Sequence, residues 1–310
     1  MYHRVARLQV DPWQLNVTPE FFAEHMQVLK KRAHPVRLEE FSRNSAASVL
    51  RKNVAVTFDD GYADNFHNAK PVLERHEIPA TFFIVSGAIN AQAEFWWDEL
   101  ERLTLAAPTL PDQFALKLEG RDYQWPLSAE APLKLIEAIP ENGTALSPAG
   151  LHAVLYRLID PLPFPEKKEV LTRIAGWAGL SAWPRPDYLP MTGRQLTEMA
   201  DSPVCAIGAH TVTHPRLSRL APAAQEIEIG QSKRDLEKIL NREVTTFSYP
   251  HGDYSEITPG LVKASGFACS CTVQPAPVQR RGDAFQLPRF KVLNWPGDQF
   301  EFELTRWLKG

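Results

Sequence analysis

The feature that most constrains the fold is a strand–helix–strand pattern near the start of the chain. Val54–Phe58 is a short β-branched run that stops at Asp59-Asp60-Gly61, and Ala80–Val85 is a second apolar run. The polar residues between them, Tyr62 to Arg75, are compatible with a helix. Two strands joined through a helix at this spacing form a βαβ unit, which requires parallel pairing. The sequence therefore predicts a parallel α/β fold.

The same alternation resumes in the last third of the chain. Short apolar runs there predict strands, and the amphipathic stretches between them predict helices. A further helix is expected from Thr18, a suitable N-cap followed by Pro19, to about Arg32. The later strands are expected at Val204–Ile207, Thr245–Tyr249, Phe267–Thr272 and Leu287–Val292, and the later helices at Ala223–Leu240 and Leu261–Ser265.

Residues from about 94 to 190 have a different character. This region opens with the aromatic cluster Phe95-Trp96-Trp97, and it closes with the proline-rich stretch Trp183-Pro-Arg-Pro186. Apolar residues at helical spacing lie between these limits, as in Val170, Ile174 and Trp177. We therefore expect one domain over residues 1–310 that carries a mostly helical insertion at about 94–190.

Composition excludes several classes of function. The net charge of −3 provides no overall basic field for nucleic acid or for an anionic membrane. No apolar stretch approaches the roughly 20 residues of a membrane span. The opening Met1-Tyr-His-Arg-Val5 lacks the pattern of a charged-then-apolar leader, so a cytoplasmic location is expected. Three cysteines without a CxxC pair predict buried free thiols rather than a disulfide framework or a structural zinc site.

Polar residues that can carry chemistry follow, or lie on, the predicted strands. They form four clusters, and active sites of parallel α/β barrels are built from several loops at the carboxyl ends of strands. Scattered surface residues have no reason to choose these positions, so the four clusters are informative as a set. They are Asp59-Asp60, His210 to His214, Tyr249-Pro250-His251 and Arg289.

Taken singly, two of these clusters have ordinary explanations. His210 and His214 together with one carboxylate form a set suited to a divalent metal, but an isolated HxxxH more often contains hydrogen-bonded loop histidines. Asp59-Asp60-Gly61 is equally compatible with a simple turn or with capping of the next helix. The metal hypothesis gives both aspartates a role, because one can bind the ion while its neighbour stays available as a base.

In combination, the clusters resemble the first four signature motifs of polysaccharide deacetylases, the NodB-homology type of carbohydrate esterase family 4. The motifs occur in the family's order, and Met1-Tyr-His-Arg-Val5 is similar to the family's first barrel strand. The resemblance covers residues 1 to about 90 and 190 to 300, and it implies a distorted (β/α)7 barrel. The matching segments are Thr57-Phe-Asp-Asp-Gly61, His210-Thr-Val-Thr-His214, Phe247-Ser-Tyr-Pro-His-Gly252 and Asp283-Ala-Phe-Gln-Leu-Pro-Arg289.

The resemblance implies a role for each matching position. Asp59 is expected to be the catalytic base, and the backbone N–H of His251 is expected to bind the oxyanion. The divalent metal, with zinc as the expected ion, polarises the acetamide carbonyl of an N-acetylated sugar or glycan precursor, and acetate is released. Its expected ligands are Asp60, His210 and His214. The expected substrate contacts are Tyr249, Pro250 and His251. Trp295, after the final predicted strand, is a further candidate for a sugar contact, although an aromatic residue at such a position is more often part of the core.

Two departures from the family pattern affect these roles. Ser248 stands where the third motif usually has an arginine that orients the catalytic aspartate, and Arg289 is expected to supply that guanidinium. No histidine follows His251, so the family's general acid has no counterpart in this sequence. His251 is a weaker candidate for proton donation or a pocket residue, and His3 is either a residue at the barrel mouth or a structural histidine. Two alternative functions therefore stay open: an O-acetyl esterase or other amidase on the same scaffold, and a sugar-binding pseudoenzyme.

Overall fold

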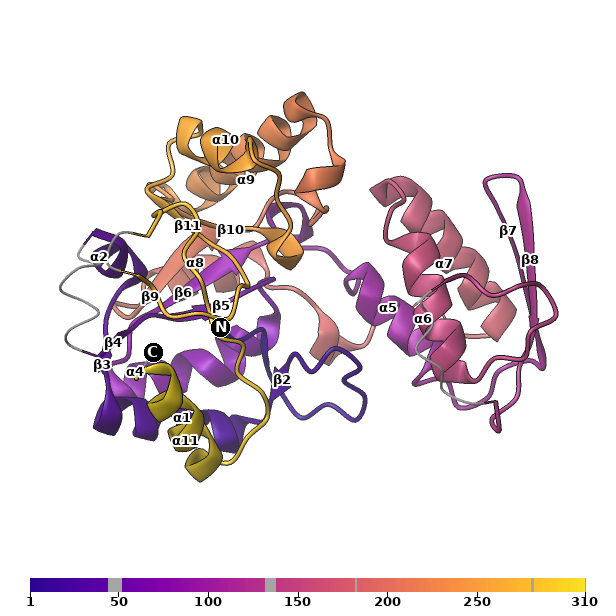
Figure 1. Ribbon diagram of the computed structural model, residues 1–310, viewed down its shortest axis with the longest axis horizontal. Helices are drawn as coiled ribbons and strands as arrows, with labels where there is room; N and C mark the ends of the chain where they lie inside the picture. The colour runs from indigo at the N-terminus through magenta and orange to yellow at the C-terminus, as the bar shows by residue number, and fades with distance from the viewer. Residues whose placement is uncertain (44–51, 132–137, 182, 280–281, 310) are drawn as a thin grey trace. The chain divides into compact units, whose positions relative to one another are not determined.

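The computed structural model contains a sheet of five parallel strands in the order β11-β10-β9-β6-β5 (Figure 1). The structure describes residues 1–43, 52–131, 138–181, 183–279 and 282–309. Every pairing within this sheet is parallel, which confirms the predicted α/β fold. The strands are β5 (Val56–Phe58), β6 (Ala80–Ile84), β9 (Cys205–Ala209), β10 (Thr246–Ser248) and β11 (Cys269–Cys271).

Two irregular segments extend this sheet and close it into a barrel. Tyr2 forms a parallel bridge with Phe58 on β5, and Leu287 forms one with Cys271 on β11. The two segments then meet, because the Met1 amino group donates to the Phe290 carbonyl and the Val292 N–H donates to the Met1 carbonyl. Seven segments thus surround one interior, and the distorted (β/α)7 barrel is confirmed.

The strand predicted at Leu287–Val292 is not a regular strand. Leu287 pairs with β11, whereas Phe290 and Val292 pair with Met1 at the other end of the sheet. Pro288 lies between these two contacts and has no N–H with which to continue a ladder. The Arg289 N–H nevertheless still donates to the Gln274 carbonyl after β11, so this irregular segment contacts both of its neighbours.

Helices cover the barrel on both sides, with α1, α4 and α11 along one side of the strands and α9 and α10 along the other (Figure 1). The predicted start at Thr18 is confirmed, since its side chain accepts a hydrogen bond from the Phe21 N–H. The helices are α1 (Pro19–Arg32), α2 (Leu38–Arg43), α4 (Lys70–His76), α8 (Gly193–Ala200), α9 (Pro222–Leu240), α10 (Thr258–Ala264) and α11 (Gly297–Trp307). Shorter elements are the π-helical turn η2 (Asn65–Ala69), the 3-10 turns η3 (Ser86–Ala88), η5 (Leu217–Arg219) and η6 (Pro250–Gly252), and the strand pairs β1 (Arg4–Val5) with β2 (Asn16–Val17) and β3 (His34–Pro35) with β4 (Asn53–Val54).

The barrel unit consists of Met1–Ala91 and Pro190–Gly310, and Gln92–Leu189 forms a second unit. The barrel unit is interrupted between Ala91 and Pro190. The residues on either side of this interruption are hydrogen-bonded to each other and to the turn after β5. Pro190 bridges Tyr62, the Met191 N–H donates to the Gly61 carbonyl, and the Asn90 N–H donates to the Met191 carbonyl. Both junctions therefore lie beside Gly61, the residue that follows Asp59-Asp60.

The second unit is mostly helical and also contains a β-hairpin. Its elements are α5 (Trp96–Thr104), β7 (Gln113–Leu118), β8 (Arg121–Pro126), α6 (Pro148–Ile159), α7 (Phe164–Ala178) and the 3-10 turn η4 (Pro186–Tyr188). The hairpin turns at Glu119-Gly120, both with positive φ, as a two-residue turn requires. This hairpin was not predicted from the sequence, although apolar residues alternate on both strands, at Phe114 and Leu116 on one and at Tyr123 and Trp125 on the other.

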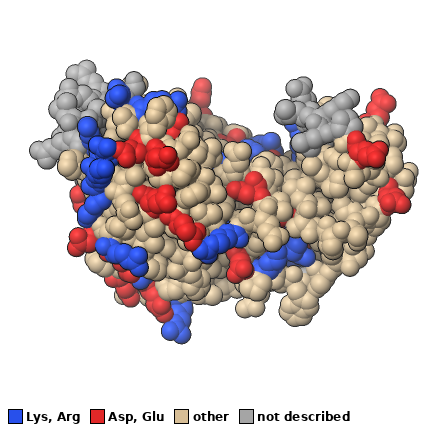
Figure 2. Space-filling view, turned by 90° about the horizontal axis from the view of Figure 1, so that it is seen from below, with Lys and Arg blue, Asp and Glu red and all other residues tan. Residues whose placement is uncertain are grey.

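The remaining global features are simple. Cys205, Cys269 and Cys271 are buried and lie outside any disulfide, as predicted. Acidic and basic side chains lie interspersed on the face drawn in Figure 2. Among the described residues, no helix combines the length and the apolar composition needed to cross a membrane.

Candidate metal centre

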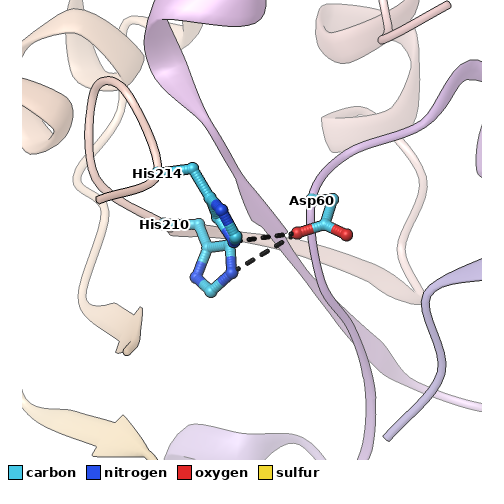
Figure 3. Close-up of side chains that lie close together, drawn as sticks. All are labelled: Asp60, His210 and His214. Carbon is cyan, nitrogen blue, oxygen red and sulfur yellow. Dashed lines mark ion pairs between the residues drawn. The ribbon is translucent and has the colours of Figure 1, made fainter. Parts of the chain in front are cut away.

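Asp60, His210 and His214 lie together at the carboxyl end of the sheet (Figure 3). Asp60 follows β5, and His210 is the first residue after β9. Both imidazoles point toward the Asp60 carboxylate, with His210 Nε2 3.5 Å and His214 Nε2 3.3 Å from the same oxygen, Oδ1. All three side chains are buried.

These separations suit three ligands of one metal ion. Ligand atoms at roughly 2.0–2.2 Å from a zinc ion lie about 3.0–3.5 Å from one another in tetrahedral or octahedral geometry. The observed 3.3 and 3.5 Å fall in that range, whereas direct N–H···O bonds are usually shorter. Two histidines and one carboxylate also leave coordination positions open for water and substrate.

The surroundings prepare the donor atoms for a cation. His210 Nδ1 lies 2.8 Å from the Ser248 carbonyl oxygen, which can only accept, so the proton resides on Nδ1 and the Nε2 lone pair faces Asp60. Burial raises the pKa of Asp60, but its contacts with the His210 and His214 imidazoles outweigh this effect and hold that pKa well below its usual value. Burial lowers the pKa of His214 and favours the neutral imidazole that a metal requires.

Unusual backbone geometry concentrates at this site. Asp60 (φ 75°), Thr211 (φ 63°), His214 (φ 59°) and His251 (φ 59°) all adopt the left-handed region although none is a glycine. Such conformations are unfavourable for ordinary residues and persist only where the surrounding structure imposes them. The strained backbone at these residues lowers the stability of the fold, and surrounding contacts maintain it. Such strain is typical of functional sites.

Asp59 is held apart from the triad by Arg289. Arg289 Nη1 and Nη2 donate to Asp59 Oδ1 and Oδ2, each at 2.7 Å, in a two-pronged pair that is buried on both sides. Burial alone would raise the pKa of Asp59, but the Arg289 charge lowers it to about 2. Asp59 is thus an ionised carboxylate next to the candidate ligands, without being one of them.

Every donor of the Arg289 guanidinium has an acceptor. Besides the two bonds to Asp59, Nε donates to the Thr272 carbonyl (2.9 Å), Nη1 to Thr57 Oγ1 (3.1 Å) and Nη2 to Ser248 Oγ (2.8 Å). These five bonds equal the five N–H groups of an arginine side chain. Ser248 Oγ also lies 3.3 Å from Asp59 Oδ2, so the serine that replaces the family's arginine belongs to the same network. Sequence reasoning did not identify Thr57 or Ser248 as members of it.

The other predicted site residues divide into two groups. The ring of His251 lies 4.5 Å from that of His214, and Pro250 begins the turn that carries His251, so both border the triad. His3 also belongs to the neighbourhood: burial lowers its pKa to about 4, while Asp60 and Asp59 act in the opposite direction.

Tyr249 and Trp295 both make packing contacts within the barrel unit. The fully buried Tyr249 donates its hydroxyl to the Phe285 carbonyl (2.8 Å) and accepts from Ser270 (2.8 Å). Trp295 packs against Trp307 of α11, and its carbonyl lies 2.7 Å from a ring nitrogen of His25 on α1. Tyr249 therefore presents no surface to a substrate, whereas Trp295 is half-buried and its sugar contact stays a prediction.

Comparisons with known proteins agree with this geometry. A family model described as polysaccharide deacetylase matches residues 46–107 and 182–270, which contain the triad, Asp59 and His251. YxkH of Bacillus subtilis (strain 168), which carries the provisional name of polysaccharide deacetylase, is 30% identical over 102 residues. That match covers 33% of this chain and 36% of YxkH.

Solved structures establish the fold over the full length of the chain. The Streptococcus pyogenes deacetylase PplD, in complex with acetate, superposes with a TM-score of 0.60 at 18% identity, covering 100% of this chain and 96% of that one. IcaB from Ammonifex degensii gives a TM-score of 0.58 at 19% identity, covering 100% and 95%. With four signature motifs in order, a matching family model and the same fold, the chain is similar to the polysaccharide deacetylases in both sequence and fold.

Proposed function

We propose that this chain is a metal-dependent hydrolase that removes an N-acetyl group from an amino sugar in a polysaccharide or glycan precursor and releases acetate. One observation carries the proposal. A buried two-histidine, one-carboxylate triad lies beside a second carboxylate, Asp59, which is ionised and fixed by a separate arginine. Asp60 can therefore act as the metal ligand while its neighbour Asp59 acts as the base. Activation of water at a metal requires both roles.

The residues fit the metal that this function needs. Asp60, His210 and His214 would hold a divalent cation, with zinc the expected ion, and the cation would supply a Lewis acid for the acetamide carbonyl and for water. Asp59 accepts a proton from the attacking water, whose oxygen adds to the carbonyl carbon. The His251 N–H donates to the resulting oxyanion, and the C–N bond then breaks to give acetate and a free amine.

The leaving amine also needs a proton, and we propose that Asp59 returns the one it accepted. With a pKa of about 2, a protonated Asp59 is a strong acid, and Arg289 favours its return to the ionised form. The lowered pKa values of His3 and His251, due chiefly to burial, keep both imidazoles neutral near pH 7 and make them poorer donors. His3→Ala and His251→Ala should therefore each reduce kcat by less than about tenfold, whereas loss of a true general acid costs about 10²–10⁴.

The test of the function is acetate release from a panel of N-acetylated sugars, nucleotide sugars and oligosaccharides. Turnover should cease after chelation and return when zinc or another divalent ion is added back. Amine detection separates the alternatives, because an O-acetyl esterase releases acetate without forming a new amine. Tight sugar binding with no acetate release, in the presence of metal, would instead identify a sugar-binding pseudoenzyme.

A further inference from the structure

The loop that carries both candidate histidine ligands has a backbone that needs external support. Between His210 and His214 the chain adopts left-handed φ values at Thr211 (63°) and at His214 itself (59°). A five-residue loop with two such positions does not hold its shape by local preference alone. Contacts from neighbouring elements must therefore fix the direction of the two imidazoles.

One side of the loop is held by a single carboxylate from helix α9. Glu228 Oε2 accepts hydrogen bonds from two consecutive backbone groups, Val212 N–H (2.8 Å) and Thr213 N–H (2.9 Å). Its other oxygen, Oε1, accepts from the Thr213 hydroxyl at 2.7 Å. Three bonds to one ionised group are charge-assisted and stronger than neutral bonds, so they oppose any movement of residues 212 and 213.

The other side of the loop is held by the turn η3 that follows β6. Ser86 N–H donates to the Thr211 carbonyl and Gly87 N–H to the Val212 carbonyl, both at 3.0 Å. A Cβ at Gly87 would lie only 2.6 Å from the Val212 carbonyl oxygen, so glycine is required for this approach. The Ser86 hydroxyl donates to Asp235 on α9 (3.1 Å), which ties the turn to the helix that carries Glu228.

We propose that Glu228 is a positioning residue for metal binding: it clamps residues 212–213 so that His210 and His214 face Asp60 before any ion arrives. The proposal rests on the metal-binding part of the proposed function. It adds a determinant outside the four signature motifs, since Glu228 lies on α9, 14 residues beyond His214. Without the clamp, the loop has to be ordered at the moment of binding, and metal affinity falls.

The experiment measures the zinc affinity of the full chain by competition with a chromophoric chelator. Glu228→Ala removes all three bonds and should weaken zinc binding at least about tenfold, the lower end of what loss of an outer-shell partner costs. Glu226→Gln is the matched control, because it removes one charge from an exposed position on the same helix and should leave affinity within about twofold. Glu228→Gln keeps an acceptor for the backbone and should fall between the two.

The outcomes separate the clamp from the proposed function. If the wild type binds zinc and Glu228→Ala binds it within about twofold as tightly, the clamp is refuted while the metal site stands. If the wild type binds no divalent ion, the metal-dependent function fails and the clamp fails with it. Should Glu228→Ala not fold, as judged by circular dichroism, Glu228→Gln decides: an unchanged affinity refutes the proposal, and a threefold or greater loss supports it.

Discussion

Arg289 offers the sharpest quantitative prediction, because it is fully engaged and almost fully buried. Replacing it by Gln removes the two bonds to Asp59 and leaves a carboxylate in an interior position. Burial is then the largest remaining influence, so the pKa of Asp59 should rise from about 2 to above its usual 3.8. At about 1.36 kcal/mol per pKa unit, the difference between 3.8 and about 2 corresponds to about 2 kcal/mol.

The sign of the pH dependence follows from that shift. In the wild type the pKa of Asp59 is depressed in the folded state, so its contribution to stability is present above about pH 4 and is lost as the pH falls toward 2. In Arg289→Gln the folded-state pKa exceeds the unfolded value, so Asp59 destabilises the fold at pH 7 and less so in acid. The gap in the free energy of unfolding between the two proteins should therefore narrow as the pH is lowered from 7 to 4.

The assay is urea denaturation of both proteins in the presence of chelator, at pH 7 and at pH 4. At pH 7 we expect a loss of about 3–5 kcal/mol for Arg289→Gln, as is typical when one partner of a buried ion pair is removed. The double variant Asp59→Asn/Arg289→Gln should recover part of it, because the uncompensated charge is gone. Two results would refute the reasoning. One is that Arg289→Gln lowers the free energy of unfolding by less than about 1 kcal/mol at pH 7. The other is that the loss in the double variant equals the sum of the losses in the two single variants.

Three further predictions follow from the site and from the second unit. Asp59→Asn should abolish acetate release while zinc remains bound, and loss of zinc from this variant would show that the two aspartates exchange roles. Arg185→Ala should unfold the second unit more easily, because Arg185 joins the buried Glu94 and Glu101 at 2.8 Å each; proteolysis within that unit is the readout, and an unchanged cleavage rate would contradict it. Replacing residues 94–190 by a short linker should spare zinc binding and alter the choice of substrate, and an unchanged substrate profile would assign the insertion to stability or assembly.

The barrel and its candidate site were largely predictable because each reactive cluster follows an apolar strand. In a parallel sheet the carboxyl ends of all strands lie at one edge, so sequence positions as distant as Asp60 and His210 are brought together by topology alone. Side-chain direction was not predictable in this way. Tyr249 also follows a strand, yet it turns into the core, because the side chains of successive residues point to opposite faces.

Glu228 shows why sequence reasoning failed to find the support of the site. It lies on an amphipathic helix beside Glu226, and nothing in the local pattern separates a carboxylate that binds two backbone amides from one that faces water. The left-handed geometry at Thr211 and His214 was equally hidden, since neither is a glycine or an asparagine. Both features depend on tertiary contacts between α9, η3 and the loop, which no single segment encodes.

Arg289 was predicted from the sequence, but its partners Thr57 and Ser248 were not. Ser248 pairs with Cys271 on β11, and Cys271 bridges Leu287, so three neighbouring segments place Ser248 and Arg289 within reach of Asp59. A guanidinium can therefore reach the same carboxylate from the segment beyond β11 instead of from β10, while the serine hydroxyl accepts one of its N–H groups. What the site requires is a charge at one point in space, and the order of the sheet determines which sequence positions can deliver it.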